Sequence, residues 1–289
     1  AFEIRVPARL ELPLVVASPH SGDLYPPDLL AATRLDGLEL RRSEDFLVHE
    51  LVAAAPLLGA AFIRARFPRA YVDVNREPYE FDPALFEEPL PPYANHRSPR
   101  VAAGLGTLAR VVASGQEIYA RPLTLAEALA RIERCYVPYH QALARLIDQV
   151  RARFGFCVLL DCHSMPTIRE TLDPASPALR AEIVLGDGHG TTAAPSLVAA
   201  AAECLAEEGL VVSLNAPYAG GFITRHYGRP EQGTHALQLE IARRLYMDEA
   251  RLLPTTGLAR LQRVAEGLMR RLGAWRPRAA TEPLPRAAE

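Results

Sequence analysis

The chain has 289 residues, of which 49% are hydrophobic, and this is enough to bury the core of one large α/β domain or of two smaller ones. The formal net charge of −2 excludes the strongly basic surface that binds nucleic acid unspecifically, although all 32 basic residues are arginine. No apolar stretch reaches the roughly 18 residues of a membrane span, and no signal-peptide pattern opens the chain. We therefore expect a globular protein with neither nucleic acid nor membrane as a partner.

The cysteines indicate a reducing compartment. They form no C-x-x-C pair, and two of them lie in a predicted strand or at its end, where reduced thiols are common: Cys135, Cys157, Cys162 and Cys204. The sequence therefore predicts a cytoplasmic protein.

The first predicted strand covers residues 12–18 and ends in the turn Ser18-Pro-His20-Ser-Gly22. Unbroken apolar runs of this kind are typical of strands covered on both faces in parallel or mixed sheets, where ligands collect beyond the carboxyl ends. Apolar residues at helical spacing then predict a helix from Glu44 to Leu58 with Ser43 as its N-cap.

Two short strands are predicted next, at 62–65 and 70–74. Asp73, Asn75 and Arg76 crowd the end of the second strand, and Arg69 directly precedes it. Guanidinium forks grip carboxylates bidentately, so this cluster is a candidate ligand-binding site. Most single arginines in such a chain are expected to be solvated surface charges.

Residues 77–99 are rich in prolines, acids and aromatics, and the segment is too long for an ordinary connection. We expect a lid-like insertion. The span 125–154 is predicted to be helical with a break near Pro138, and His140 on it is expected to be a packed structural histidine.

A further apolar run, 156–160, leads into Asp161-Cys-His163-Ser-Met-Pro166. A strand, a helix and a strand follow at 182–185, 191–208 and 210–214. His163 thus repeats the strand-end position of His20. Either histidine alone is more often a hydrogen-bonding core residue, but two of them beyond buried strands predict a metal site.

The last predicted strand, 235–241, places Gln238 and Glu240 on one face and apolar residues on the other. Glu240 is a candidate general base, and an ion pair with Arg243 or Arg244 is the alternative. A helix is predicted from 248 to 272, and the residues beyond 275 are expected to be disordered. We therefore expect one catalytic domain, 1–275, followed by a tail, 276–289.

Zinc in a hydrolytic site generally takes three protein ligands and leaves one position for water. Two would be His20 and His163, and the third remains to be chosen among nearby acids. Asp45 and Glu44, at the start of the predicted helix, are the best carboxylates, and Asp23 competes because it follows His20 at the spacing of a local ligand pair. Asp45 is favoured because the following helix would orient it, whereas Asp23 lies in a loop.

Taken together, these segments resemble the N-formylglutamate amidohydrolase family, whose fold is related to that of the zinc carboxypeptidases and aspartoacylase. The resemblance spans residues 18–243 and is carried by Ser18-Pro-His-Ser-Gly22, Glu44-Asp45, Phe67-Pro-Arg-Ala-Tyr-Val-Asp-Val-Asn-Arg76, Tyr139-His140, Leu160-Asp-Cys-His-Ser-Met-Pro166, Asn215-Ala-Pro-Tyr-Ala-Gly-Gly221 and Gln238-Leu-Glu-Ile-Ala-Arg243. It implies a single-domain α/β fold of the hydrolase type, with a mixed, mostly parallel sheet flanked by helices.

The resemblance also implies an activity, release of formate from N-formyl-L-glutamate in histidine degradation. It implies that His20 and His163 bind zinc, that Glu240 is the general base, that Arg69 polarises the carbonyl, and that Asn75 and Arg76 hold a substrate carboxylate.

For the second carboxylate of such a substrate, the glycine-bearing loop before the last strand offers Arg225, with a solvated surface hairpin as the alternative.

Two other functions stay open. One is a deacylase or carboxypeptidase-like metallohydrolase acting on another N-acyl amino acid or peptide, and the other is a non-enzymatic binding protein on the same scaffold.

Overall fold

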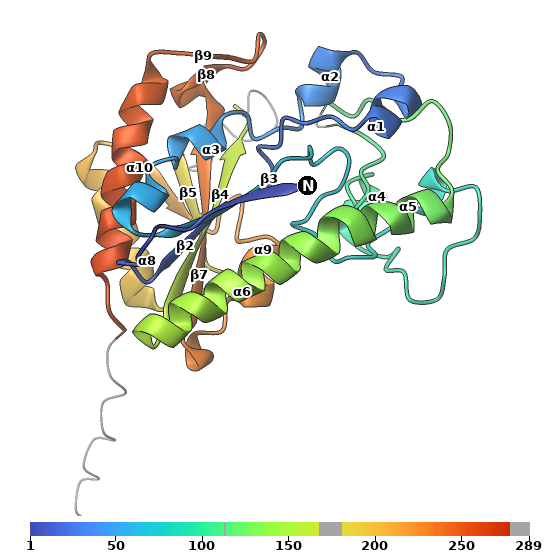
Figure 1. Ribbon diagram of the computed structural model, residues 1–289. Coiled ribbons are helices and arrows are strands. Elements are labelled where there is room, and N and C mark those ends of the chain that lie inside the picture. The colour runs from blue at the N-terminus through green and yellow to red at the C-terminus, as the bar shows by residue number, and fades with distance from the viewer. Residues whose placement is uncertain (113, 168–180, 278–289) are drawn as a thin grey trace, which may run out of the picture.

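The computed structural model describes residues 1–112, 114–167 and 181–277, and its centre is a seven-stranded mixed sheet (Figure 1). Its strands lie in the order β1 (Phe2–Arg5), β3 (Ala61–Ala65), β2 (Leu14–Ser18), β4 (Cys157–Met165), β7 (Thr234–Ala242), β5 (Ile183–Gly186) and β6 (Val212–Leu214). The four central strands β3, β2, β4 and β7 are parallel, whereas β1 pairs antiparallel with β3 and β5 with β7. The predicted mixed, mostly parallel α/β class is confirmed.

Helices cover both faces of this sheet (Figure 1). One layer contains α3 (Val48–Leu51), α8 (Pro195–Glu207) and α10 (Gly257–Ala274), and the other contains α6 (Val137–Phe154) and α9 (Phe222–Tyr227). Shorter helices lie toward the amino-terminal half: α1 (Pro27–Ala32), α2 (Gly37–Arg41), α4 (Pro99–Ala102) and α5 (Leu125–Arg131). Among the described residues, no helix is both long enough and apolar enough to cross a bilayer.

The alternation of side chains along β4 places the polar residues on the α6 side of the sheet. Leu160 and Cys162 pack into the core beneath α8 and α10, whereas Leu159 packs into the core beneath α6. Because successive side chains point to opposite faces, Asp161 and His163 continue the face of Leu159. That face is thus apolar along the middle of β4 and polar at its carboxyl end.

The strand register then fixes which polar residues meet. In the β4–β7 ladder, Asp161 lies opposite Gln238, and His163 lies opposite Glu240. In the β2–β4 ladder, Ala17 lies opposite Asp161, so the turn that follows β2 begins beside His163. Parallel strands therefore bring three separate polar segments to the same edge of the sheet.

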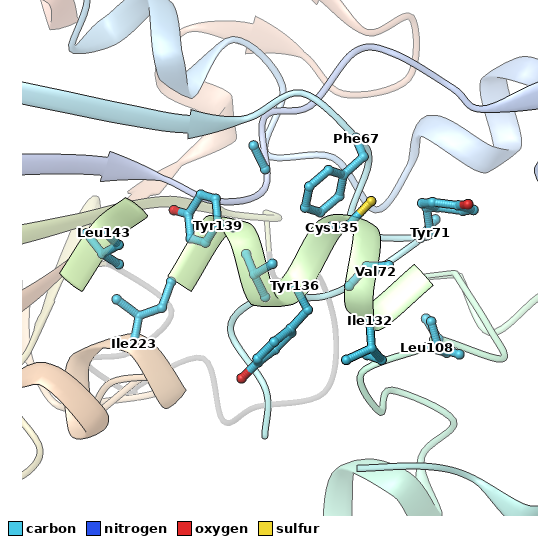
Figure 2. Close-up of a cluster of buried hydrophobic side chains, with 14 of the residues drawn as sticks. Phe67, Tyr71, Val72, Leu108, Ile132, Cys135, Tyr136, Tyr139, Leu143 and Ile223 are labelled. Atoms are coloured by element: carbon cyan, nitrogen blue, oxygen red, sulfur yellow. The ribbon is translucent and has the colours of Figure 1, made fainter. Parts of the chain in front are cut away.

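The predicted break near Pro138 is a π-helical turn, Ile132–Tyr136, which joins α5 to α6. Pro138 lacks the N–H that a regular α-helix would use at this point, so the ladder of hydrogen bonds is locally changed. Figure 2 shows Cys135 and Tyr136 of this turn in the same buried cluster as Phe67 and Tyr71. The turn therefore supports the loop that follows β3.

The predicted strand 70–74 is wrong. This segment is a buried turn in which the N–H of Tyr71 donates to the carbonyl of Pro68, and the N–H of Asp73 donates to the carbonyl of Thr107. Its apolar residues are buried against the π-helical turn (Figure 2) rather than in the sheet. An apolar run indicates burial, but it does not by itself specify an extended backbone.

The predicted continuous helix from Glu44 to Leu58 is also wrong, because this span contains only the short helix α3 (Val48–Leu51) and a separate 3₁₀ helix, Ala55–Leu58. Leu47 has a left-handed backbone (φ 58°), so α3 begins only at Val48 and Ser43 is not its N-cap. The predicted C-terminal helix starts later than expected, at Gly257, because β8 (Met247–Asp248) and β9 (Leu253–Pro254) form a small hairpin before it.

In the insertion 77–99, Phe81, Leu85 and Phe86 are buried in the core on the α6 side. Movement of this insertion as a lid stays a prediction. The expected disordered tail falls on 276–289, of which 278–289 lie outside the described residues.

Candidate active site

Three ligand atoms converge at the carboxyl edge of the sheet: His20 Nδ1, His163 Nδ1 and Asp45 Oδ2. The two Nδ1 atoms are 3.1 Å apart, and Asp45 Oδ2 lies 3.0 Å from that of His163 and 3.4 Å from that of His20. Tetrahedral zinc with bonds of about 2.0–2.1 Å needs ligand atoms roughly 3.3–3.4 Å apart. The three separations, 3.0–3.4 Å, are therefore close to those of one triangular face of a zinc site.

A carboxylate lies beside the outer nitrogen of each histidine. His20 Nε2 is 2.7 Å from Asp73 Oδ1, and His163 Nε2 is 3.1 Å from Asp161 Oδ1. Metal-binding histidines commonly donate their second N–H to such a carboxylate. A proton on each Nε2 leaves both Nδ1 lone pairs and the Asp45 oxygen facing a common point, where a cation would satisfy all three.

Arg243 orients Asp45, a role that the sequence did not suggest. Its Nη2 lies 3.4 Å from Asp45 Oδ1 and donates to the carbonyl of Glu44 at 2.6 Å, while its Nε donates to Ser164 Oγ. The N–H of Asp45 also donates to the carbonyl of His20. A network of hydrogen bonds, rather than a helix, thus holds this carboxylate.

The two competing acids lie elsewhere. Asp23 accepts from Arg66 on the surface, and Glu44 accepts from Tyr25 and Arg41. Of the three candidates for an acidic ligand, only Asp45 faces the histidines.

The electrostatics of the cluster favour a positive charge at its centre. Burial alone would raise the pKa of Asp45, yet its hydrogen bonds with His163 and His20 hold that pKa well below the usual range. Burial would likewise lower the pKa of His163, but Asp161 and Asp45 raise it well above its ordinary value. The protonated form of His163 thus supplies the positive charge that a metal ion would bring to this cluster.

Glu240 lies beside this cluster and carries an unusual carboxyl group. Burial raises its pKa to about 7, and Asp45 adds to the rise, while His163 and Arg69 oppose it. Its Oε1 accepts a hydrogen bond from Gln238 Nε2 at 2.9 Å. A carboxyl group with a pKa near neutrality exchanges protons readily at physiological pH.

The alternative ion pair of Glu240 is not formed among the described residues. Arg243 contacts Asp45 instead, and the guanidinium of Arg244 faces the carbonyl of Ala181 at 3.4 Å. Glu240 therefore keeps its carboxylate directed toward the cavity.

Arg69, Asn75 and Arg76 all line the same cavity of about 590 Å³, which also contains the three ligand atoms and Glu240. Arg69 Nη2 donates to Asp73 Oδ2 at 2.8 Å. Arg76 donates through Nε to the carbonyl of Leu105 and through Nη1 to that of Asn75, so two of its nitrogens are already engaged.

The side chain of Asn75 joins α9 to the histidine cluster. Its Oδ1 accepts from the N–H of Ile223 at 2.8 Å, and its Nδ2 lies 3.2 Å from His163 Nε2. Gly221 makes this contact possible, because a Cβ there would lie 2.2 Å from Asn75 Nδ2.

Arg225 lies on α9 and lines the cavity, but its Nε and Nη2 both donate to the carbonyl of Gly220.

His140 is a packed structural histidine, as the sequence predicts. Its Nε2 donates to the carbonyl of Val74, and its Nδ1 lies 2.9 Å from the hydroxyl of Tyr227.

Tyr218 and Arg100 are, like Arg243, lining residues whose place in the site sequence reasoning missed. Tyr218 belongs to the Asn215–Gly221 motif but gave no signal of its own, and Arg100 is one of many arginines. Nothing in their sequence neighbourhoods sets either apart.

Comparison with known proteins adds three findings. Residues 12–247 match the sequence model of a family described as N-formylglutamate amidohydrolase. N-formylglutamate deformylase of Pseudomonas aeruginosa is 31% identical over 245 residues, covering 83% of this chain and 84% of the relative, and that of Pseudomonas putida is 30% identical over 242 residues, covering 82% and 83%. The crystal structure of N-formylglutamate amidohydrolase from Ralstonia eutropha JMP134 is similar with a TM-score of 0.85 and 37% identity, over 94% of this chain and 96% of that chain.

Proposed function

Because the chain belongs to the N-formylglutamate amidohydrolase family, we propose that it hydrolyses N-formyl-L-glutamate to formate and L-glutamate. The observation that carries this proposal is the triangle of His20, His163 and Asp45 beside a buried Glu240 in one cavity. A role in histidine degradation belongs to the same proposal. The four cysteines are buried and unpaired, which supports a cytoplasmic location.

The proposed cofactor is one zinc ion held by His20, His163 and Asp45. Two imidazoles and one carboxylate are a common ligand set of hydrolytic zinc sites, and the separations of the three atoms fit it. When bound, zinc would lower the pKa of a water molecule toward about 7 and withdraw electrons from the formyl oxygen.

Glu240 is proposed to move the proton of the reaction. In its ionised form it accepts a proton from the attacking water, and in its protonated form it returns that proton to the leaving amine nitrogen. A pKa of about 7 suits both steps, because neither state of the carboxyl group is strongly disfavoured. Water oxygen adds to the formyl carbon, the C–N bond breaks, and formate and glutamate result.

Arg69 is proposed to donate to the formyl oxygen as negative charge develops there. Asp73 orients its guanidinium through the 2.8 Å contact and also faces His20 Nε2. One carboxylate therefore positions both a metal ligand and the arginine, which keeps the oxyanion-binding group in place before the reaction begins.

The two carboxylates of the substrate are proposed to bind the arginine-lined wall formed with Asn75, Arg76 and Arg225. A neutral N-formyl amino acid would leave a desolvated guanidinium without its partner, which costs several kcal/mol. We therefore expect kcat/KM for N-formylglutamate to exceed that for N-formylmethionine by about 100-fold or more.

The test is a formate-release assay on N-formyl-L-glutamate, N-formyl-L-aspartate and N-formyl-L-methionine, with metal content measured on the same preparation. N-formylaspartate keeps both charges at a shorter separation and should be a poorer substrate without being inert. Arg76→Lys should lower kcat/KM for N-formylglutamate because lysine cannot form the bidentate fork. Equal kcat/KM for N-formylglutamate and N-formylmethionine would instead indicate a general deformylase or deacylase.

A further inference from the structure

A second cavity of about 510 Å³ adjoins the first, and Asn75, Arg76, Arg100 and Arg225 line both. Three guanidinium groups thus lie at the junction of the two cavities. They come from separate segments, since Arg76 follows the buried turn after β3, Arg100 lies on α4 and Arg225 on α9. The junction is therefore built by the fold rather than by one run of basic sequence.

The three arginines differ in what already engages them. Nε and Nη1 of Arg76 donate to backbone carbonyls, and its Nη2 lies 3.6 Å from Asp73. Nε and Nη2 of Arg225 donate to the carbonyl of Gly220. Within residues 1–112, 114–167 and 181–277, the half-buried side chain of Arg100 makes no hydrogen bond and no ion pair.

A guanidinium on a cavity wall that makes no hydrogen bond or ion pair with the described residues can bind an anion. All five of its N–H donors are available, including the planar pair that matches the two oxygens of a carboxylate. The positive charge of Arg100 also acts against that of Arg76, which burial already disfavours. A bound carboxylate would reduce this repulsion.

We propose that Arg100, rather than Arg225, is the specificity-determining residue that binds the side-chain carboxylate of the substrate. This inference rests on the proposed deformylase function. Arg76 lies closer to the metal site, through its contact with Asp73, and we assign it the α-carboxylate, which is separated from the formyl nitrogen by a single carbon. The side-chain carboxylate extends farther from the formyl group, toward the junction with the second cavity.

The experiment compares the zinc-loaded wild-type enzyme with Arg100→Gln, using matched substrates in a formate-release assay. N-formyl-L-glutamate and the α-amide of N-formyl-L-glutamate keep the side-chain carboxylate, whereas N-formyl-L-glutamine replaces it with an amide of the same shape. We expect Arg100→Gln to raise KM about 10- to 100-fold for the first two substrates, as loss of a charged hydrogen bond does, and to leave kcat within a few-fold. For N-formylglutamine, KM should change less than about threefold.

Arg97→Gln is the matched control, because it removes the same charge from the same segment at an exposed position outside both cavities. Its kinetic constants should match those of the wild type on every substrate. Arg100→Lys keeps the charge without the planar fork and should raise KM for N-formylglutamate by a smaller factor, which provides a second readout if the glutamine variant folds poorly.

Several results would overturn the inference. One is an equal change in KM for N-formylglutamate and N-formylglutamine in both Arg100 variants, and another is no change for either substrate. A loss confined to substrates with a free α-carboxylate would assign Arg100 to the other end of the molecule. If the wild type released no formate from N-formylglutamate, the proposed function itself would fail. If the wild type preferred N-formylglutamate and Arg100→Gln had the same kinetic constants as the wild type, only the inference about Arg100 would be refuted.

Discussion

At the scale of single residues, the site contains two buried carboxyl groups whose surroundings shift their pKa values in opposite directions. Hydrogen bonds with His163 and His20 lower the pKa of the buried Asp45, whereas burial, with Asp45 as a neighbour, raises the pKa of Glu240. The proposed ligand Asp45 can therefore stay ionised while the proposed base Glu240 exchanges a proton. The same kind of side chain performs two tasks because its neighbours differ.

Replacing Glu240 with glutamine should retain the fold and the metal while turnover falls by about 10²–10⁴-fold, because an isosteric amide cannot accept the proton. The kinetic constants for formate release and the zinc content check this expectation. Glu231→Gln, an exposed change just before β7, is the control and should keep wild-type activity. A near-normal kcat for Glu240→Gln would transfer the role of the base to another carboxylate.

Gly221 shows how a residue without a side chain supports the site. Its backbone is in an ordinary region (φ −85°), so alanine there is not strained by its own conformation. The added Cβ would instead lie 2.4 Å from Asn75 Oδ1. The cost of Gly221→Ala therefore arises from displacing Asn75 and, through it, His163.

We expect Gly221→Ala to lower the free energy of unfolding by about 1–3 kcal/mol, as overpacking does, and to lower kcat/KM as well. Gly267→Ala in the middle of α10 is the control, because its Cβ would meet no atom within 4 Å. That change should leave kcat/KM unchanged and raise stability by up to about 1 kcal/mol. Chemical denaturation measures the free energy of unfolding, and the formate-release assay measures kcat/KM. Unchanged activity in Gly221→Ala would mean that α9 shifts to make room for the Cβ without moving Asn75.

At the scale of the elements, the sequence predicts strands better than it predicts helix starts. The apolar runs of β2 and β4 end in polar residues, and this pattern alone placed His20 and His163 at the edge of the sheet. No comparable pattern marks the left-handed backbone of Leu47, which starts α3 later than predicted. Local spacing cannot reveal such a turn, because long-range contacts determine it.

The position of Asp45 shows the same limit. The sequence favoured it because a helix was expected to orient it, but the structure orients it through Arg243 and the carbonyl of His20. Arg243 is distant in the sequence, and its contacts depend on the end of β7 lying beside the loop before α3. Arg100 could not be singled out for a similar reason, since only the folded chain brings α4 to the cavity.

His140 couples helix α6 to the loop that carries Asn75, and it does so in its neutral form. Burial lowers its pKa to about 4, whereas an unfolded histidine titrates near 6.5. The unfolded chain therefore binds a proton first as the solution becomes acidic. The stability that depends on neutral His140 is complete above about pH 6.5 and is lost progressively as the pH falls toward 4.

The wild type should thus lose up to about 3 kcal/mol of stability between pH 7 and pH 4 through His140, at about 1.4 kcal/mol per pKa unit. His140→Gln should show a shallower dependence over the same range, since glutamine does not titrate. Urea denaturation of both proteins with chelator present isolates the effect, because the other histidines are common to both. Parallel pH profiles would show that His140 is not the titrating group.

At the scale of the whole molecule, the proposed metal site brings together segments that are far apart in the chain. His20 follows β2, Asp45 precedes α3, and His163 lies on β4. A ligand that binds only the folded state stabilises it in proportion to the logarithm of its concentration. Zinc should therefore act on global unfolding rather than on one local segment.

We expect zinc at about 100 times its dissociation constant to raise the free energy of unfolding by about 2.7 kcal/mol, and chelation to remove that gain. His20→Ala and His163→Ala should lose the metal and the zinc-dependent gain while remaining folded. His96→Ala, at an exposed position, should retain both. Elemental analysis and thermal denaturation provide the measurements, and full metal content in both ligand variants would place the site elsewhere.

The placement of the arginines also has an evolutionary consequence. The proposed zinc ligand His163 and the proposed base Glu240 lie on paired strands, where inserting one residue would turn every later side chain of that strand to the opposite face. Arg100 lies instead on the short helix α4, whose flanking loops tolerate changes in length. Mutations accumulated during evolution, or a directed library confined to α4, could therefore change which acyl amino acid is accepted while the residues proposed for hydrolysis stay in place.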